Sequence, residues 1–272
     1  MSLIGLSRNI IDKYYTKKNI VKYCIKIIKK YLKINKYNDL IIEPSAGNGS
    51  FIEYIKKICN NNIYLDIKPE NKEIIKQNYL NYNPKKILKK YNKIHIIGNP
   101  PFGRQSSLAI KFIKKSCLFC DSFSFILPKS FKKESLKNKI PLNFHLLVEK
   151  DLPEYSFIVD KKDYNVPCIF QIWIKKSKER NKNIKQISKY FIFVKKNDNP
   201  DISIRRIGTN AGKIYENIKE KNSNSHYFIK IRKNYNKNKI ISLLKKKQYN
   251  IFNNTVGPLS ISKQELIIYY NN

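Results

Sequence analysis

The chain has 272 residues, of which 42% are hydrophobic and 12% aromatic, and 55 Lys and Arg against 20 Asp and Glu give it a net charge of +35. This composition excludes collagen-like, fibrous and mostly disordered proteins, and the length suits one full domain with a small second one. Lys and Asn interrupt every Ile-rich run well short of a membrane span, and residues 1–9 lack the apolar stretch of a signal peptide.

The size of the positive charge predicts a polyanionic partner. An AT-rich coding sequence would raise Lys, Asn and Ile by mutational bias alone, but it would raise Glu as well, so the excess of bases remains an electrostatic signal. We therefore expect nucleic acid, either DNA or RNA, as the partner and no membrane. General solubility is the alternative interpretation of the charge, and the oligomeric state is left open.

The cysteine pattern favours unbridged thiols over disulfides or a metal site. The five cysteines are odd in number and scattered, with a single C-x-x-C, and the three histidines stand alone rather than at ligand spacing. We expect buried free thiols, no bound metal, and a reducing intracellular compartment, cytoplasmic or nuclear. The residues are Cys24, Cys59, Cys117, Cys120 and Cys168, with His95, His145 and His226.

Strand-like and helical segments alternate along the first half of the chain. This alternation predicts an α/β fold with a doubly wound, mostly parallel sheet of the Rossmann-like type. Thr16 is the predicted N-cap of the first helix. In chain order the predicted segments are a helix within residues 14–31, a strand at 39–43, a helix at 50–59, strands at 62–66 and 94–98, a helix at 107–119 and a strand at 122–127.

The second half of the chain reads differently. Strand-like runs at 144–150, 167–175 and 190–195 follow, and because no comparable helix separates the last two, antiparallel strands near one end of the sheet are expected. A polar stretch at 176–185 predicts a boundary between a main domain, residues 1–180, and a small C-terminal α+β region, residues 181–272. Within that region we expect strands at 202–208 and 226–232 and a Lys-rich helix at 238–247.

The turn after the first predicted strand has the composition of a cofactor-binding turn. Glu43 and Pro44 end the strand, and Gly47 and Gly49 follow, so that a ligand could touch the backbone. In doubly wound folds this turn binds a nucleotide-like cofactor at the carboxyl edge of the sheet. A lone G-x-G also fits an ordinary strand-to-helix turn, and no Gly-Lys-Ser/Thr follows that would make it a phosphate loop.

The next strand ends in Asp66, about 20 residues past the glycines. A carboxylate at this place can accept hydrogen bonds from both hydroxyls of a ribose. Taken alone, Asp66 is equally an ordinary surface residue at a strand end.

The most specific motif is Asn99-Pro100-Pro101-Phe102, directly after the strand at 94–98. Two prolines fix φ and remove two backbone donors, so we expect the carbonyls of Asn99 and Pro100 to point into the cleft. The Asn99 side-chain oxygen and the Pro100 carbonyl can accept the two N–H groups of a flat amino-heterocycle while Phe102 stacks on its face. The alternative is a generic loop breaker with an exposed Phe.

Together these motifs resemble class I S-adenosylmethionine-dependent amino-methyltransferases of the N6-adenine type, with the gamma-like order of cofactor motif before catalytic motif, over about residues 13–175. The resemblance implies S-adenosylmethionine as the cofactor and direct in-line methyl transfer to the exocyclic N6 amine of adenine, with no general base and no metal. The catalytic residues it implies are Asn99, Pro100, Pro101 and Phe102. The cofactor-binding residues it implies are Tyr15, Thr16, Glu43, Pro44, Ala46, Gly47, Gly49, Phe51, Asp66, Ile67, Asn78 and Tyr79.

The chain departs from that family at three positions. Lys17 replaces the Pro that follows the aromatic-x-Thr stretch, and Phe102 stands where many relatives have Tyr. Asn78 stands where relatives carry an Asp that holds the adenine amino group of the cofactor. An amide oxygen can accept the same hydrogen bond, but without the assistance of charge, so weaker cofactor binding is expected.

Several functions remain open at this point. Methylation of adenine in DNA is slightly favoured over RNA, including cap-adjacent adenosine. A protein-glutamine methyltransferase uses a similar tetrapeptide, although +35 disfavours it. A methyltransferase fold kept as a non-catalytic nucleic-acid-binding subunit is a further alternative, and the intact motifs disfavour it.

Basic residues near the motif and in the C-terminal region are interleaved with aromatic and small residues. That pattern suits a surface contacting phosphates, and the alternative is solvated strand faces. The predicted nucleic-acid contacts are Arg104, Lys129, Arg205, Arg206, Lys213 and Lys230.

Overall fold

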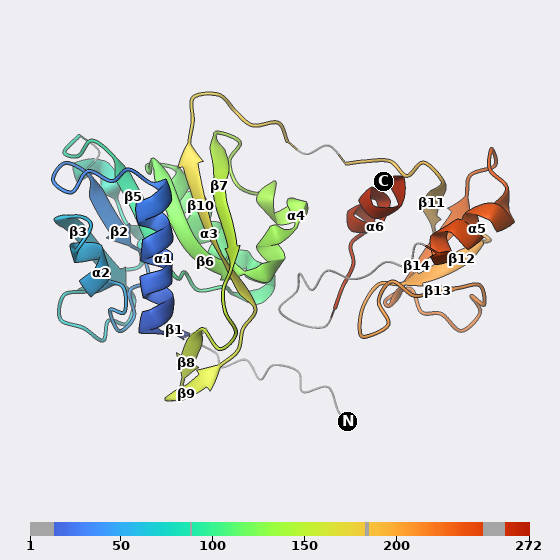
Figure 1. Cartoon of the computed structure of the whole chain (residues 1–272), viewed down its shortest axis with the longest axis horizontal. Coiled ribbons are helices and arrows are strands. Elements are labelled where there is room, and N and C mark those ends of the chain that lie inside the picture. Colours follow the sequence, from blue (N-terminus) through green and yellow to red (C-terminus); the bar gives the residue numbers. More distant parts are fainter. Residues whose placement is uncertain (1–13, 88, 183–184, 247–258) are drawn as a thin grey trace. The chain divides into compact units, whose positions relative to one another are not determined.

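The computed structural model describes residues 14–87, 89–182, 185–246 and 259–272, and the chain divides into two compact units, residues 1–182 and 183–272 (Figure 1). The first unit holds a seven-stranded and a three-stranded sheet, and the second holds a four-stranded sheet. Within the described ranges, no helix is long and apolar enough to cross a membrane.

The seven-stranded sheet has the order β4-β3-β2-β5-β6-β10-β7. The first five strands in this order are parallel, and β10 runs antiparallel to both of its neighbours. The chain therefore winds outward from β2 in both directions, which confirms the doubly wound, Rossmann-like prediction and puts the topological switch point between β2 and β5. The strands are β2 (Leu40–Glu43), β3 (Asn61–Asp66), β4 (Ile75–Lys76), β5 (Ile94–Gly98), β6 (Ser122–Pro128), β7 (Phe144–Asp151) and β10 (Cys168–Lys175).

The two faces of this sheet are covered by helices. Leu40, Ile42, Ile94 and Ile96 alternate along β2 and β5 and pack in one buried cluster with α3 (Ser107–Cys117). Helices α1 (Lys18–Tyr31) and α2 (Ile52–Lys56) lie on the opposite face (Figure 1). Each fully buried aliphatic side chain contributes about 1.5–3 kcal/mol, so the continuous aliphatic strands supply most of the driving force for this layered core.

The connections carry short helices. The 3-10 helices are η1 (Tyr79–Asn81), η2 (Pro84–Lys86), η3 (Arg104–Ser106) and η4 (Lys129–Lys132), and η4 leads into α4 (Glu134–Lys137). The helix expected at 50–59 is shorter than predicted, since only Ile52–Lys56 is α-helical.

The predicted N-cap at Thr16 is wrong. Helix α1 begins at Lys18 with Lys17 as its N-cap, and no side chain caps it. Thr16 instead belongs to β1 (Tyr15–Thr16), which pairs with β8 (Phe157–Val159) of a hairpin completed by β9 (Lys162–Tyr164). A two-residue strand whose partner lies some 140 residues away leaves no local signal, so the capping preference of Thr was misleading.

Buried polar contacts hold the amino ends of three strands together. His95 Nδ1 lies 2.7 Å from Ser122 Oγ, and His95 Nε2 lies 3.3 Å from Asp39 Oδ2. All three residues are at most 3% exposed, and burial lowers the pKa of His95 against the opposing effect of Asp39. This serine, histidine and aspartate have no access for a substrate, so the contacts are structural, and the histidine that has no partner in the sequence pattern has two in the fold.

All five cysteines are buried and unbridged, which confirms that part of the sequence prediction. Burial raises the pKa of the Cys24, Cys117, Cys120 and Cys168 thiols, so these side chains behave as small apolar groups.

The second unit is an antiparallel sheet of order β11-β14-β12-β13 packed against two helices. Its elements are β11 (Phe191–Val194), β12 (Ile202–Arg205), β13 (Ile214–Tyr215), β14 (His226–Ile231), α5 (Lys237–Lys246) and α6 (Lys263–Asn271). The expectation that the run at 190–195 joins the end of the large sheet is wrong, because β11 pairs with β14. For residues 167–175 the antiparallel expectation is confirmed.

Candidate functional site

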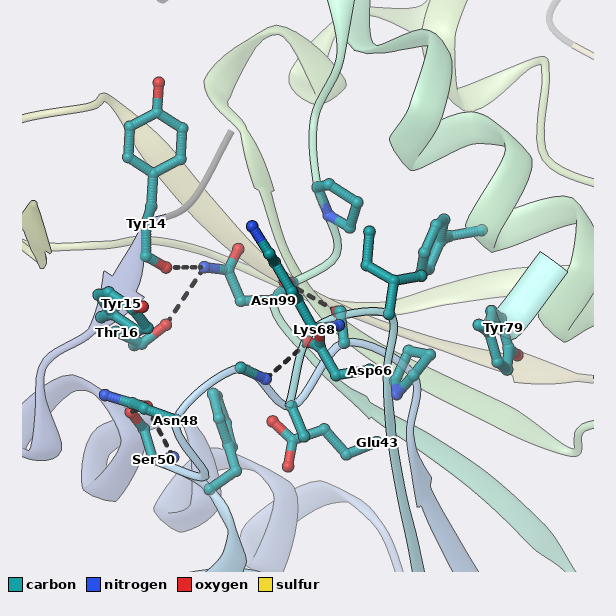
Figure 2. A pocket seen from close by; sticks show the side chains of 18 of the residues that line it. Tyr14, Tyr15, Thr16, Glu43, Asn48, Ser50, Asp66, Lys68, Tyr79 and Asn99 are labelled. Carbon is teal, nitrogen blue, oxygen red and sulfur yellow. Dashed lines mark hydrogen bonds between the residues drawn. The ribbon is translucent and has the colours of Figure 1, made fainter. Parts of the chain in front are cut away.

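A cavity of about 310 Å³ opens at the carboxyl ends of β2, β3 and β5 (Figure 2). This is the switch point of the doubly wound sheet, where folds of this type bind ligands, and the volume is at the lower end of the range for small-molecule sites. Residues from β1, the turn after β2, the end of β3, η1, the segment after β5 and α3 line it.

Most of the residues singled out in the sequence line this one cavity. They are Tyr15, Thr16, Glu43, Pro44, Ala46, Gly47, Phe51, Asp66, Ile67, Asn78, Tyr79, Asn99 and Pro101. Gly49, Pro100 and Phe102 are not among the lining residues. Lining residues that the sequence analysis missed are Tyr14, Ser45, Asn48, Ser50, Lys68, Leu80, Leu108 and Phe112.

The two glycines of the turn after β2 have different roles. Both have positive φ, +55° at Gly47 and +86° at Gly49. Gly47 forms the cavity wall and donates its N–H to Asp66 Oδ2 at 2.7 Å. A Cβ at Gly49 would lie 2.8 Å from Ile52 Cδ1, so Gly49 shapes the turn rather than the cavity.

Asp66 is held rigidly by backbone groups. Its Oδ2 accepts the Gly47 N–H and its Oδ1 accepts the Lys68 N–H, each at 2.7 Å. Each carboxylate oxygen has more than one lone pair, so the side chain is fixed in position and still able to accept hydrogen bonds from a ligand. The contact with Gly47 ties the ends of β2 and β3 together beside the cavity (Figure 2).

Glu43 is an unusual carboxyl group for its place. It is 2% exposed, lines the cavity, and its Oε2 has no hydrogen-bond partner among the described residues. Burial, with the negative charge of Asp66 as a second cause, raises the pKa of Glu43 to about 8. A buried acceptor without a partner is costly, so a ligand that brings a donor or a positive charge would be stabilised here.

The Asn99 amide is fixed in one orientation. Its Nδ2 donates to the Tyr14 carbonyl at 3.2 Å and to Thr16 Oγ1 at 3.3 Å (Figure 2). Because a carbonyl can only accept, the nitrogen must face Tyr14, which leaves Oδ1 as the acceptor on the other side. That Oδ1 is buried and has no hydrogen-bond partner in the described ranges.

The expectation that both backbone carbonyls of the motif are free needs a correction. The Asn99 carbonyl accepts the hydroxyl of Ser45 at 3.0 Å, a contact between the turn after β2 and the segment after β5. This bond helps to fix the backbone of Asn99, and so the side chain rather than the carbonyl of Asn99 is available to a ligand.

Phe102 is not the exposed loop residue of the alternative interpretation. It is 7% exposed and stacks on Tyr14, with ring centroids 5.9 Å apart and an interplanar angle of 27°. Tyr14 in turn stacks on Tyr164 of β9 at 5.6 Å. The ring that lines the cavity is therefore Tyr14, and Phe102 supports it from behind the cavity wall.

Two further predicted cofactor residues have partners within the protein. Asn78 is exposed, and its side-chain oxygen accepts the Leu80 N–H at 3.0 Å, capping η1. Tyr79 is buried, with its hydroxyl 2.7 Å from Ser116 Oγ. Asn78 thus has one acceptor direction already occupied, in addition to lacking the charge of an Asp.

The predicted nucleic-acid contacts divide between the two units. Arg104 is exposed in η3, two residues after Phe102, and Lys129 in η4 lies 3.8 Å from Asp151. The other four, Arg205, Arg206, Lys213 and Lys230, belong to the second unit. In the parts of the chain that the structure describes, no group of three or more His, Cys, Asp or Glu could hold a metal ion.

No protein-family model and no curated protein sequence matches the chain. Among solved structures, it is similar to a proposed RNA methyltransferase from Pyrococcus horikoshii at 16% identity, covering 64% of this chain and 93% of the other, with a TM-score of 0.44. It is similar to a proposed class I S-adenosylmethionine-dependent methyltransferase from Listeria monocytogenes at 14% identity, covering 66% and 65%, with a TM-score of 0.46.

A third similar structure is the N-methyltransferase NodS from Bradyrhizobium japonicum, at 7% identity, covering 58% of this chain and 97% of the other, with a TM-score of 0.39. The strand order of the large sheet itself carries the assignment to the Rossmann-like class I type: five parallel strands that switch direction between β2 and β5, then one antiparallel strand, β10, before the edge strand β7.

Proposed function

We propose that the chain is an S-adenosylmethionine-dependent methyltransferase that methylates the exocyclic N6 amine of adenine in nucleic acid. The observation that supports this most is the unpartnered, buried Oδ1 of Asn99 at the wall of a ligand-sized cavity. An acceptor in a fixed orientation, beside aromatic rings, is what an aromatic amine requires and what a hydroxyl or carboxylate substrate does not.

The cavity suits the cofactor at both of its ends. Asp66 can accept the ribose hydroxyls, and the unpartnered Glu43 carboxyl can receive positive charge. Ile67, Leu80 and Phe112 supply the apolar surface that a purine ring needs. When bound, S-adenosylmethionine supplies a methyl group on a sulfonium: the amine lone pair forms the new N–C bond as the C–S bond breaks, and sulfur keeps the electron pair.

The residues of the chain act on the amine mainly by positioning. Asn99 Oδ1 accepts one N–H of the amine, and the Pro100 carbonyl, to which no described residue donates, accepts the other. These two bonds turn the nitrogen lone pair away from the ring and towards the cavity. The product amine then loses its proton to water, so the proposal requires no general base.

Aromatic stacking against the target base is assigned to Tyr14 as well as to Phe102. Tyr14 lines the cavity, and its carbonyl accepts the Asn99 amide, so the ring and the amine acceptor are fixed by the same segment. Phe102 and Tyr164 stack on Tyr14 and hold its ring in place. Stacking of a base on such a ring is worth about 1–3 kcal/mol.

The net charge of +35 supports nucleic acid as the carrier of the adenine. A base inside a duplex must leave its stack to enter the cavity, at a cost of a few kcal/mol, which favours unpaired or easily opened sites. DNA remains slightly favoured, with RNA, including cap-adjacent adenosine, as the alternative.

The proposal is tested by methyl transfer from labelled S-adenosylmethionine to single-stranded DNA, duplex DNA, RNA and capped RNA, followed by nucleoside analysis. We expect label on N6 of adenine in at least one polymer and its loss in Asn99→Ala. The matched control is Asn60→Ala, an exposed asparagine outside the cavity. Transfer of label to another atom, or none to any polymer by a chain that binds the cofactor, would contradict the proposal.

A further inference from the structure

The second unit has a hollow of its own, with a volume of about 510 Å³, lying over β11 and β14 and the start of α6. Four cationic side chains and two aromatic rings stand out among its lining residues: Lys195, Lys196, Arg206 and Lys263, with Phe193 and Tyr227. Of the contacts predicted from the sequence, Arg206 alone lines this hollow.

The aromatic rings hold two of these cations in place. The Arg206 guanidinium lies 5.2 Å from the centroid of the Tyr227 ring, and Lys263 Nζ lies 4.9 Å from the centroid of Phe193. Tyr227 is itself fixed, because its hydroxyl donates to the Ile261 carbonyl at 3.0 Å. A guanidinium stacked on a ring keeps its N–H edge available for a hydrogen-bonded anion.

The positive charge of the hollow is not neutralised by acids. The ion pairs found among the described residues of this unit join Lys237 to Asp201 and Lys245 to Glu216, away from the hollow. The nearby Glu265 carboxylate accepts the Ser262 N–H in the capping box of α6.

One lysine of the hollow is held by the backbone. Lys196 Nζ donates to the Lys219 carbonyl at 2.7 Å, which positions the amine without removing its charge. In addition, Nε of Arg206 is buried and lacks a partner among the described residues. An oxyanion would satisfy this group and the surrounding positive charge together.

We infer that this hollow binds phosphate groups of a nucleic-acid backbone. Arg206 offers the fork that matches a phosphate, and Lys195, Lys196 and Lys263 add point charges around it. Residues 183–272 contain 18 Lys and Arg against 5 Asp and Glu, so the surroundings also attract an extended polyanion rather than a single ion. The hollow is thus a second contact for the polymer that the proposed function requires, and the choice of nucleic acid rests on that function.

The test measures binding of a fluorescently labelled single-stranded oligonucleotide to the full chain without cofactor, over a range of salt concentrations. In Arg206→Gln with Lys263→Gln we expect affinity to fall about tenfold or more and the log-log salt slope to fall by about 1.4–1.8, since each lost phosphate contact removes about 0.7–0.9. The matched control, Lys233→Gln with Lys239→Gln, removes two charges from exposed lysines of the same unit outside the hollow. It should change affinity less than threefold.

A second variant guards against misfolding. Lys195→Gln with Lys263→Gln changes two exposed side chains and leaves Arg206 stacked on Tyr227, so it should fold normally and still lose affinity and slope. Equal losses in the hollow and control variants would overturn the inference. So would competition by polyglutamate as strong as that by unlabelled oligonucleotide, or tight binding of inorganic phosphate alone, since either would make the ligand something other than a nucleic-acid backbone.

The failure of this inference and the failure of the proposed function can be told apart. Hollow-dependent oligonucleotide binding without any methyl transfer would support the hollow and contradict the enzyme. Methyl transfer to N6 of adenine with unaltered binding in both hollow variants would support the enzyme and overturn the hollow.

Discussion

The cavity of the first unit and the hollow of the second are built from opposite chemistry. Buried acceptors without partners, Glu43 Oε2 and Asn99 Oδ1, characterise the cavity, whereas unpaired cations such as Lys195, Arg206 and Lys263 surround the hollow. A buried acceptor discriminates at short range, because an unsuitable ligand leaves it unsatisfied. Exposed cations act at long range and are screened by salt. The difference assigns chemistry and cofactor selection to the first region and capture of the polymer to the second.

The largest expected effect comes from removing the amine acceptor. Asn99→Ala should lower the single-turnover methylation rate by at least about 100-fold, the scale for a misplaced reacting group, while cofactor affinity stays within about twofold. Rapid-quench kinetics gives the rate and calorimetry the affinity. A rate near that of the parent would show that the amine is positioned by another group, and Asn60→Ala is the control that should leave both values unchanged.

The next effect is on cofactor binding. Asp66→Ala removes the proposed ribose acceptor and the anchor of the Gly47 and Lys68 N–H groups, so affinity for S-adenosylmethionine should fall by about 1.5–3 kcal/mol. Asp66→Asn, which keeps one acceptor, should lie between this variant and the parent. Calorimetry that shows unchanged affinity in Asp66→Ala would remove Asp66 from the site.

Glu43 predicts a pH dependence that the hollow does not share. In the cofactor-free protein its pKa is raised to about 8, and a cationic ligand favours the carboxylate, so binding below that pH must release a proton. The Glu43 contribution should therefore strengthen binding about tenfold per pH unit up to about pH 8 and then level off. The α-amino group of the cofactor titrates near the same pH, so the quantity to measure is the difference between the parent and Glu43→Gln. No difference in slope would contradict the role of Glu43.

The same carboxyl acts on stability with a defined sign. Because its folded pKa lies above the ordinary value of 4.5, the folded protein holds a proton that the unfolded chain releases between pH 4.5 and about 8. The stabilising contribution is fully present below pH 4.5 and is lost as the pH rises towards 8. Denaturant unfolding of the cofactor-free protein should show this decline, and Glu43→Gln should show less of it.

The residues at strand ends could be found in the sequence. Short aliphatic strands fix the positions of Glu43, Asp66 and Asn99 at their carboxyl ends, and parallel pairing brings those ends together. Helix α6 could also have been found, since Ser262 and Glu265 have the spacing of a capping box.

The groups that orient these residues could not be found in the same way. Thr16 and the Tyr14 carbonyl hold the Asn99 amide from 83 and 85 residues away, through a strand of two residues. Likewise, Lys195 and Lys263 line one hollow although nearly 70 residues separate them. Such contacts depend on tertiary packing, to which neither periodicity nor turn preference responds.

The smallest expected effect separates the surface predicted from the sequence from the hollow found in the structure. Arg205 donates its Nε–H to the Ile207 carbonyl at 2.9 Å, and neither Arg205 nor Lys230 lines the hollow. Arg205→Gln with Lys230→Gln should therefore weaken oligonucleotide binding less than threefold and change the salt slope by less than about 0.7, the value for one phosphate contact. The same anisotropy titration, run beside the Arg206 and Lys263 double variant, provides the comparison. If the two variants lose the same affinity and slope, phosphate is bound by the whole strand face of β12 and β14, and the hollow has no special part in capturing the polymer.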